Sequence, residues 1–225
     1  MPPIMSRRAI IGSAALLPIL ALPGCAGERF SLVEAIRRLL SLSSQRAFAS
    51  LIRENGFLDT AMTKIDIPDA LGGTRSTNII AALLRTDAFR SRLTKQVNRA
   101  AEKGAELAAP VVADAVRTVG IDDAVSLVKG GPTAATDFLK GRMGNALTSA
   151  MPQGISDGLK LFDSAVVTEA LKVATGIDFA GLRDDVTVKA SDAIFRAIGR
   201  EEAAIRANPS QTNDPLLIGV FTLLK

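Results

Sequence analysis

The stretch VTVKASDAIFRAIGREEAAIRA, residues 186–207, carries the clearest helical pattern in this chain. Glu201-Glu202 and Arg206 lie mostly off its apolar face, which predicts a solvated side with a charge contact between neighbouring turns. Asn208-Pro209 ends the pattern, because the residue before a proline is pushed away from helical geometry. The face that we expect to be buried repeats about every 3.6 residues and consists of Val188, Ser191, Phe195, Ile198 and Ile205.

The same period recurs along most of the chain before this helix. From Phe30 it predicts a helix that ends at Asn55-Gly56, with the glycine in the left-handed position. Pro110 is expected to start a separate helix, since proline is favoured in the first turn. No pair of segments has hairpin turn chemistry. We therefore predict an all-α fold, a single compact domain of about seven to nine helices of unequal length over residues 30–225.

Short polar and apolar segments separate or end the helices that we expect in this domain. Asp122 is expected to cap a short helix over 123–129, which Gly130-Gly131-Pro132 ends. Thr133 then caps the next helix, although the free N–H groups of that helix start could instead contact an anion. The apolar tail 216–221 is expected either to dock as a last helix or to stay exposed as a contact site.

The beginning of the chain resembles an export and lipid-anchoring signal. Arg7 and Arg8 follow a polar residue and precede an uncharged apolar run, as in a twin-arginine leader. The run is about fifteen residues long, shorter than the roughly 20 needed to cross a bilayer. It ends at Leu22-Pro23-Gly24-Cys25, which resembles a bacterial lipoprotein processing site and contains the only cysteine of the chain.

We therefore expect a leader over residues 1–24, acylation of Cys25 and a lipidated tether over 25–29. The alternatives are an uncleaved anchor or an ordinary secretory signal with a chance cysteine. The residue after the cysteine is Ala26, and the lack of aspartate there favours the outer membrane in Gram-negative bacteria. The expected location is the cell envelope, on the periplasmic face of the outer membrane, with the membrane as a partner through the lipid.

Charge and composition argue against a nucleic-acid partner. The formal net charge is +4, but removing Arg7 and Arg8 leaves 25 basic against 23 acidic residues, a net charge of +2. The chain has no Trp and no Tyr, so only phenylalanines could stack on bases. An acylated Cys25 also leaves no thiol for a disulfide, so stability has to come from a hydrophobic core.

The residues that are missing restrict the chemistry further. The chain has no histidine, hence no imidazole base and no histidine metal ligand. With Cys25 lipidated there is no thiolate nucleophile either. Serine–histidine hydrolases, cysteine proteases and most zinc enzymes are thereby excluded, and we expect no catalytic residue, no metal site and no cofactor.

The candidate binding residues are polar side chains in two segments. Asn98 and Glu102 share a helix face at spacing i,i+4, with Arg99 beside them. These side chains are expected to form a polar network that stabilises the connection between helices near Thr133 and Asp137. The alternative is that they form a solvated helix face. Read as a site for a ligand or partner, the full set is Asn98, Arg99, Glu102, Thr133, Thr136 and Asp137.

Three motifs in order give the chain a family resemblance. They are VNRAAEK at 97–103, GGPTAATDFL at 130–139 after the Asp122-Asp123-Ala124 helix start, and EEAAIRANP at 201–209. Together they resemble a bacterial family of exported helical proteins, often lipoproteins, known only as a domain of unknown function. The resemblance covers about Leu32 to Phe221. It implies an all-helical envelope protein and no particular activity.

The expected function is therefore non-enzymatic binding of a partner protein or an apolar ligand by a lipid-anchored envelope protein. One alternative is an enzyme that uses carboxylates or lysine, which a cleft grouping Asn98, Arg99, Glu102 and Asp137 would favour. The other is a structural or assembly factor, for which an exposed 216–221 tail would be the sign.

Overall fold

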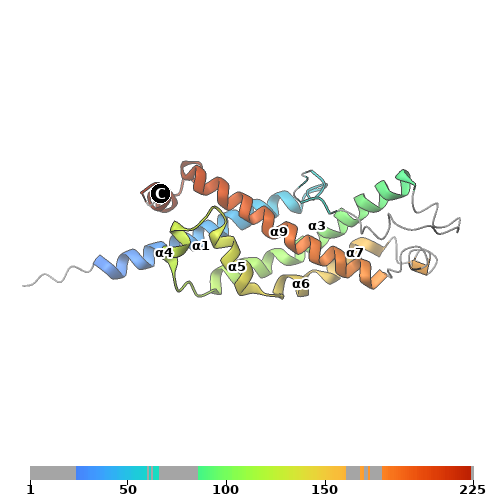
Figure 1. Cartoon of the computed structure of the whole chain (residues 1–225), viewed down its shortest axis with the longest axis horizontal. Coiled ribbons are helices and arrows are strands. Elements are labelled where there is room, and N and C mark those ends of the chain that lie inside the picture. Colours follow the sequence, from blue (N-terminus) through green and yellow to red (C-terminus); the bar gives the residue numbers. More distant parts are fainter. Residues whose placement is uncertain are drawn as a thin grey trace, which may run out of the picture.

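Three long helices form the frame of the molecule: α1 (Gly24–Leu51), α3 (Asp87–Thr118) and α9 (Phe179–Ala207). They run along its long axis, α1 in one direction and α3 and α9 in the other (Figure 1). Contacts between α1 and α3 agree, since Arg37 bonds Val119 whereas Glu54 pairs with Arg99. The computed structural model describes residues 24–59, 61, 63–65, 86–160, 168–169, 172 and 179–223, without the side chains of 24–31.

Shorter helices cover this frame. α4 (Ala124–Lys129) and α5 (Ala134–Met143) lie against α1 and α9, and α6 (Ala146–Ala150) and α7 (Pro152–Leu159) pack on α3. The chain closes with the 3₁₀ helix η3 (Pro209–Thr212) and α10 (Pro215–Leu223). Within the described ranges there are eight α-helices and no strand, which confirms the all-α prediction.

The core lies where the long helices meet. Side chains from all three are fully buried there, including Leu40 of α1, Val97 of α3 and Ile194 of α9. α7 approaches α3 closely because Gly154 and Gly158 have no side chains. A Cβ at either position would collide with the α3 backbone at Lys103 or Ala100. One continuous core of this size agrees with a single domain.

The ends of α1 differ from the prediction. The helix begins at Gly24, so the expected tether 25–29 belongs to its first turns. No proline interrupts the chain between Gly24 and Phe30, and the helix continues through Gly27. After Leu51 the left-handed residue is Asn55, with φ 62°, and not Gly56. Gly56 is needed for another reason: a Cβ there would collide with the last carbonyls of α1.

Two details of the long helices were predicted wrongly. Pro110 does not start a helix but lies inside α3, which continues from Asp87 to Thr118. The ring costs one backbone hydrogen bond, and packing of α3 on α1 and α7 keeps the helix continuous. On α9, Val188 is 55% exposed, whereas the rest of the predicted face (Ser191, Phe195, Ile198 and Ile205) is buried.

The apolar tail docks on the domain. α10 contacts α1 and η3, and buries Leu217 and Phe221. Its neighbours Leu216 and Val220 are partly buried against the same core. Of the two alternatives predicted for segment 216–221, the structure therefore shows the docked last helix.

Candidate functional site

The second and third sequence motifs meet at a buried junction of α4, α5 and α9, here called the α4–α5 junction. The carboxylate of Glu202 is fully buried. It accepts the backbone N–H groups of Ala135 and Thr136 at 3.0 and 2.7 Å, and the Thr136 hydroxyl at 2.6 Å. The start of α5 does hold an anion, as helix N-termini favour. That anion is a side chain of the protein itself.

Arg206 completes the α4–α5 junction. Its Nε donates to Glu202 at 2.8 Å, and its terminal nitrogens donate to the carbonyls of Val128 and Leu127 at 3.0 and 2.9 Å. The guanidinium also lies 4.9 Å from the ring centre of Phe221. The predicted solvated side of this helix was therefore wrong for Glu202 and Arg206, because α4 and α5 cover it.

Thr133 and Asp137 lie at the edge of this junction. Thr133 occupies the N-cap position of α5 but makes no capping bond. Its hydroxyl donates instead to the Asp137 carboxylate at 2.9 Å, in an exposed contact. The expected cap is thus replaced by Glu202, and the N–H groups of Ala135 and Thr136, which an external anion would need, are occupied.

Asn98 and Glu102 form a separate structural contact. The fully buried Asn98 accepts the N–H of Ile65 at 2.9 Å and donates to the Ile65 carbonyl at 3.0 Å. Burial raises the pKa of Glu102, partly offset by the charge of Arg99 and by the N–H groups of Asn55 and Gly56. Both side chains therefore attach the segment after α1 to α3.

The six candidate residues do not come together. Arg99 is exposed and pairs with Glu54 at 3.1 Å, on the side of α3 that faces the end of α1. Thr133, Thr136 and Asp137 lie on α5, with Thr136 bound to α9. The cleft that would favour a carboxylate enzyme, grouping Asn98, Arg99, Glu102 and Asp137, is not formed by these residues.

A groove of about 820 Å³ lies between α1 and the C-terminal half of α3, here called the α1–α3 groove. Its volume falls within the range of small-molecule sites. The α1 side is one helical face, with lining residues every three or four positions from Glu34 to Phe48. At 1.5 Å per residue this face is about 21 Å long.

The α1–α3 groove changes character along its length. At one end lie Arg37 and Arg38 of α1 and Arg117 of α3. The opposite end is apolar, with Phe48 on α1 and Pro110 on α3. This order follows from the antiparallel course of α1 and α3, which sets Arg37 beside the end of α3, where it donates to the Val119 carbonyl at 3.3 Å.

Two polar groups that line the groove lack partners. Ser44, midway along the α1 side, is only 5% exposed, and its hydroxyl has no hydrogen-bond partner among the described residues. The same holds for the buried Nε of Arg37. Buried polar atoms are nearly always bonded to protein or to water, so these two unpaired atoms in the wall of the groove each lack a partner that water or a bound molecule would supply.

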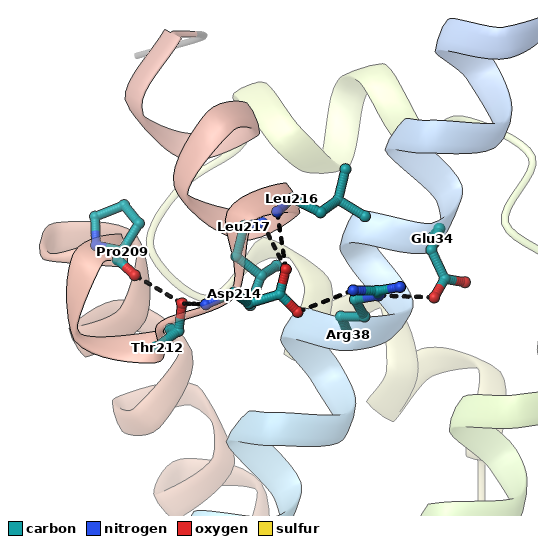
Figure 2. Close-up of polar contacts among 7 residues, drawn as sticks. All are labelled: Glu34, Arg38, Pro209, Thr212, Asp214, Leu216 and Leu217. Atoms are coloured by element: carbon teal, nitrogen blue, oxygen red, sulfur yellow. Dashed lines mark hydrogen bonds and ion pairs between the residues drawn. The ribbon is translucent and has the colours of Figure 1, made fainter.

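The charged end of the groove is connected to the last helix. Figure 2 shows Arg38 between two carboxylates, Glu34 at 2.8 Å and Asp214 at 3.2 Å. Asp214 also caps α10, accepting the N–H groups of Leu216 and Leu217 at 2.9 and 3.3 Å. Burial alone would raise the pKa of Asp214, but the Leu217 N–H, Arg38 and the Leu216 N–H outweigh it and lower that pKa.

Sequence reasoning did not single out Arg37 or Ser44. A signal was present: on α1, polar residues at 34, 37, 41 and 44 share one face, which becomes apolar at Phe48. The export residues Arg7 and Arg8 lie outside the described residues. Cys25 lies in the first turn of α1, and its side chain is likewise outside the description.

The described residues contain no group of three or more potential metal-ligating side chains. None of the helices in the described ranges is both long and apolar enough to cross a membrane.

Fold and site thus define a class: an all-α domain with a sealed polar junction and an open amphipathic groove. The chain belongs to the family described as Protein of unknown function (DUF4197), whose sequence profile matches residues 28–222. This confirms the resemblance to a family known only as a domain of unknown function. No curated protein and no solved structure matches the chain.

Proposed function

We propose that this protein is an exported, lipid-anchored protein of the bacterial cell envelope that binds a ligand without catalysis in the α1–α3 groove. The observation that carries the proposal is the unpartnered Ser44 hydroxyl in a groove of about 820 Å³. The leader-like Arg7-Arg8 run and the processing motif at Cys25 support export and anchoring at the periplasmic face of the outer membrane.

The two alternatives have less support. An assembly factor would use an exposed apolar tail, yet Leu217 and Phe221 are buried against the domain. An enzyme would need its polar side chains in one cleft, yet Asn98 and Glu102 are engaged with residues 55–65. The groove, by contrast, has both polar and apolar surface available.

Ligand binding is tested by native mass spectrometry of the full chain purified from the envelope. The exposed Ala113 lines the groove, so Ala113→Trp places an indole ring in it and obstructs it. Ala204→Trp, on the exposed side of α9, is the matched control. We expect a reproducible adduct with the wild type and with Ala204→Trp, lost on denaturation and absent from Ala113→Trp. An adduct that survives Ala113→Trp would place binding elsewhere.

Anchoring is tested separately with Cys25→Ala in the full chain. The wild type should incorporate labelled palmitate and sediment with outer membranes, and the variant should do neither. A Lys-Lys pair in place of Arg7-Arg8 should leave the protein in the cytoplasm. Palmitate incorporation by Cys25→Ala would refute the lipoprotein assignment.

A further inference from the structure

We infer that the occupant of the α1–α3 groove is a single anionic glycerophospholipid, with its phosphate at Arg37, its ester oxygens at Ser41 and Ser44, and an acyl chain along Phe48 and Pro110. This inference rests on the proposed function, because it names the ligand of the same groove. It follows from three observations. These are the order in which residues of different polarity line the groove, the charge of Arg37, which no carboxylate among the described residues pairs with, and the dimensions of the groove.

The polarity of the groove has three zones in the order that a glycerophospholipid requires. Three arginines, with Glu34 and Val116, occupy one end. Hydroxyl groups and the Gln45 amide occupy the middle, and apolar side chains occupy the other end. Ser41 already accepts from Gln45 at 3.2 Å, so its own O–H remains a donor. Ser44 has no partner in the described structure. Ester oxygens accept hydrogen bonds but donate none, which matches two free hydroxyl donors.

The charges at the cationic end leave Arg37 for an anion. Arg38 already lies between the carboxylates of Glu34 and Asp214. Arg117 pairs with Asp114, but both side chains are more than half exposed, and exposed pairs of this kind are weak. Arg37 has no carboxylate partner among the described residues, and its Nε is buried and unpaired. A phosphate there would form charge-assisted hydrogen bonds.

The dimensions favour a small molecule over a helix of a partner protein. The lining face of α1 is about 21 Å long, and an α-helix with its side chains is about 10–12 Å across. A groove of about 820 Å³ has the volume of a small-molecule site, in which such a helix could lie only along the rim.

The test is a titration of the full chain, purified in mild detergent, followed by native mass spectrometry. The probe is oleoyl-lysophosphatidylglycerol, which has the phosphate, one ester and one chain. Oleoylglycerol keeps the ester and chain without the phosphate, and glycerol 3-phosphate keeps the phosphate without the chain. We expect one lysophosphatidylglycerol per protein, and binding at least about tenfold weaker for either partial ligand.

Variants assign the contacts. Arg37→Gln should weaken lysophosphatidylglycerol binding at least about tenfold, as loss of a charged hydrogen-bonding partner does. Binding of oleoylglycerol should not change in that variant. Arg90→Gln, at an exposed position of α3 outside the groove, is the matched control and should bind both lipids like the wild type. Ala113→Trp should abolish binding of both, with circular dichroism showing that it remains folded.

The outcomes separate this inference from the proposed function. Equal binding of oleoylglycerol and lysophosphatidylglycerol, insensitive to Arg37→Gln, would overturn the phospholipid assignment and leave a groove for apolar ligands. Binding of glycerol 3-phosphate alone at full strength would also overturn it. Binding of no probe, with the envelope adduct still lost in Ala113→Trp, would mean a different ligand. Absence of any adduct that depends on the groove would overturn both.

Discussion

The α4–α5 junction and the α1–α3 groove both place arginine beside hydroxyl groups, but only the junction is complete. Every polar side-chain atom of Glu202 and Arg206 has a partner within 3.0 Å. In the groove the Ser44 hydroxyl and the Nε of Arg37 have none among the described residues. A saturated polar cluster stabilises the fold, whereas an unsaturated one in the wall of a groove still lacks partners that a ligand or water would supply.

The largest expected effect comes from removing the acid of the α4–α5 junction. Glu202→Ala leaves the Arg206 charge buried and removes the acceptor at the start of α5, so unfolding free energy should fall by about 3–5 kcal/mol. Urea denaturation measures it. The control is Glu201→Ala, since that carboxylate is 3.7 Å from Arg200 and partly exposed, and should cost less than about 1 kcal/mol. Equal losses would contradict a structural role specific to Glu202.

Two adjacent glycines of the junction give a smaller, matched comparison. A Cβ at Gly130 would lie 2.5 Å from the Ala134 Cβ, whereas one at Gly131 meets nothing within 4 Å. Gly130→Ala should therefore lower unfolding free energy by about 1–3 kcal/mol, and Gly131→Ala should change it by less than about 0.5 kcal/mol. Thermal unfolding of both variants decides this, and a costly Gly131→Ala would mean that the loop packs differently.

The link between the groove and α10 predicts a pH dependence. Asp214→Ala removes the helix cap and should cost about 1 kcal/mol at pH 7, whereas Asp214→Asn keeps the cap and should cost less. Because folding lowers the pKa of Asp214, its charge adds stability above the unfolded-state pKa near 3.9, and that stability is lost as the pH falls below it.

The advantage of the wild type over Asp214→Asn should accordingly be present at pH 7 and vanish near pH 2. Urea denaturation across that range measures it. A difference that is constant over the whole range would show that Arg38 does not hold the ionised carboxylate (Figure 2).

How much could be predicted from sequence depends on whether a feature is local or long-range. The 3.6-residue period identified α9, and Asn208-Pro209 gave its end at Ala207, because periodicity and proline act within a few residues. The burial of Glu202 and Arg206 could not be predicted in this way. It is produced by α4 and α5, whose contacting residues precede them by more than 60 positions.

Propensity rules also failed where packing outweighed them. Pro110 should favour a helix start, yet α3 continues through it because the helix as a whole packs on α1 and α7. Thr133 has the residue type and position of a cap, but Glu202 supplies a charged acceptor instead. The candidate site was predicted at the wrong residues for the same reason. The motif residues bond to other parts of the fold, and the residues that line the groove belong to no motif.

The contrast between the two regions is tested most directly by measuring two quantities in two variants. The quantities are the unfolding free energy and the affinity for lysophosphatidylglycerol, and the variants are Thr136→Val and Ser44→Ala. Thr136→Val removes a hydrogen bond to a buried carboxylate and should cost about 1.5–3 kcal/mol while leaving affinity unchanged. Ser44→Ala removes a buried, unpaired hydroxyl, so it should leave stability unchanged or raise it by up to about 1–3 kcal/mol, and it should weaken binding. A loss of stability without loss of affinity in Ser44→Ala would contradict the account.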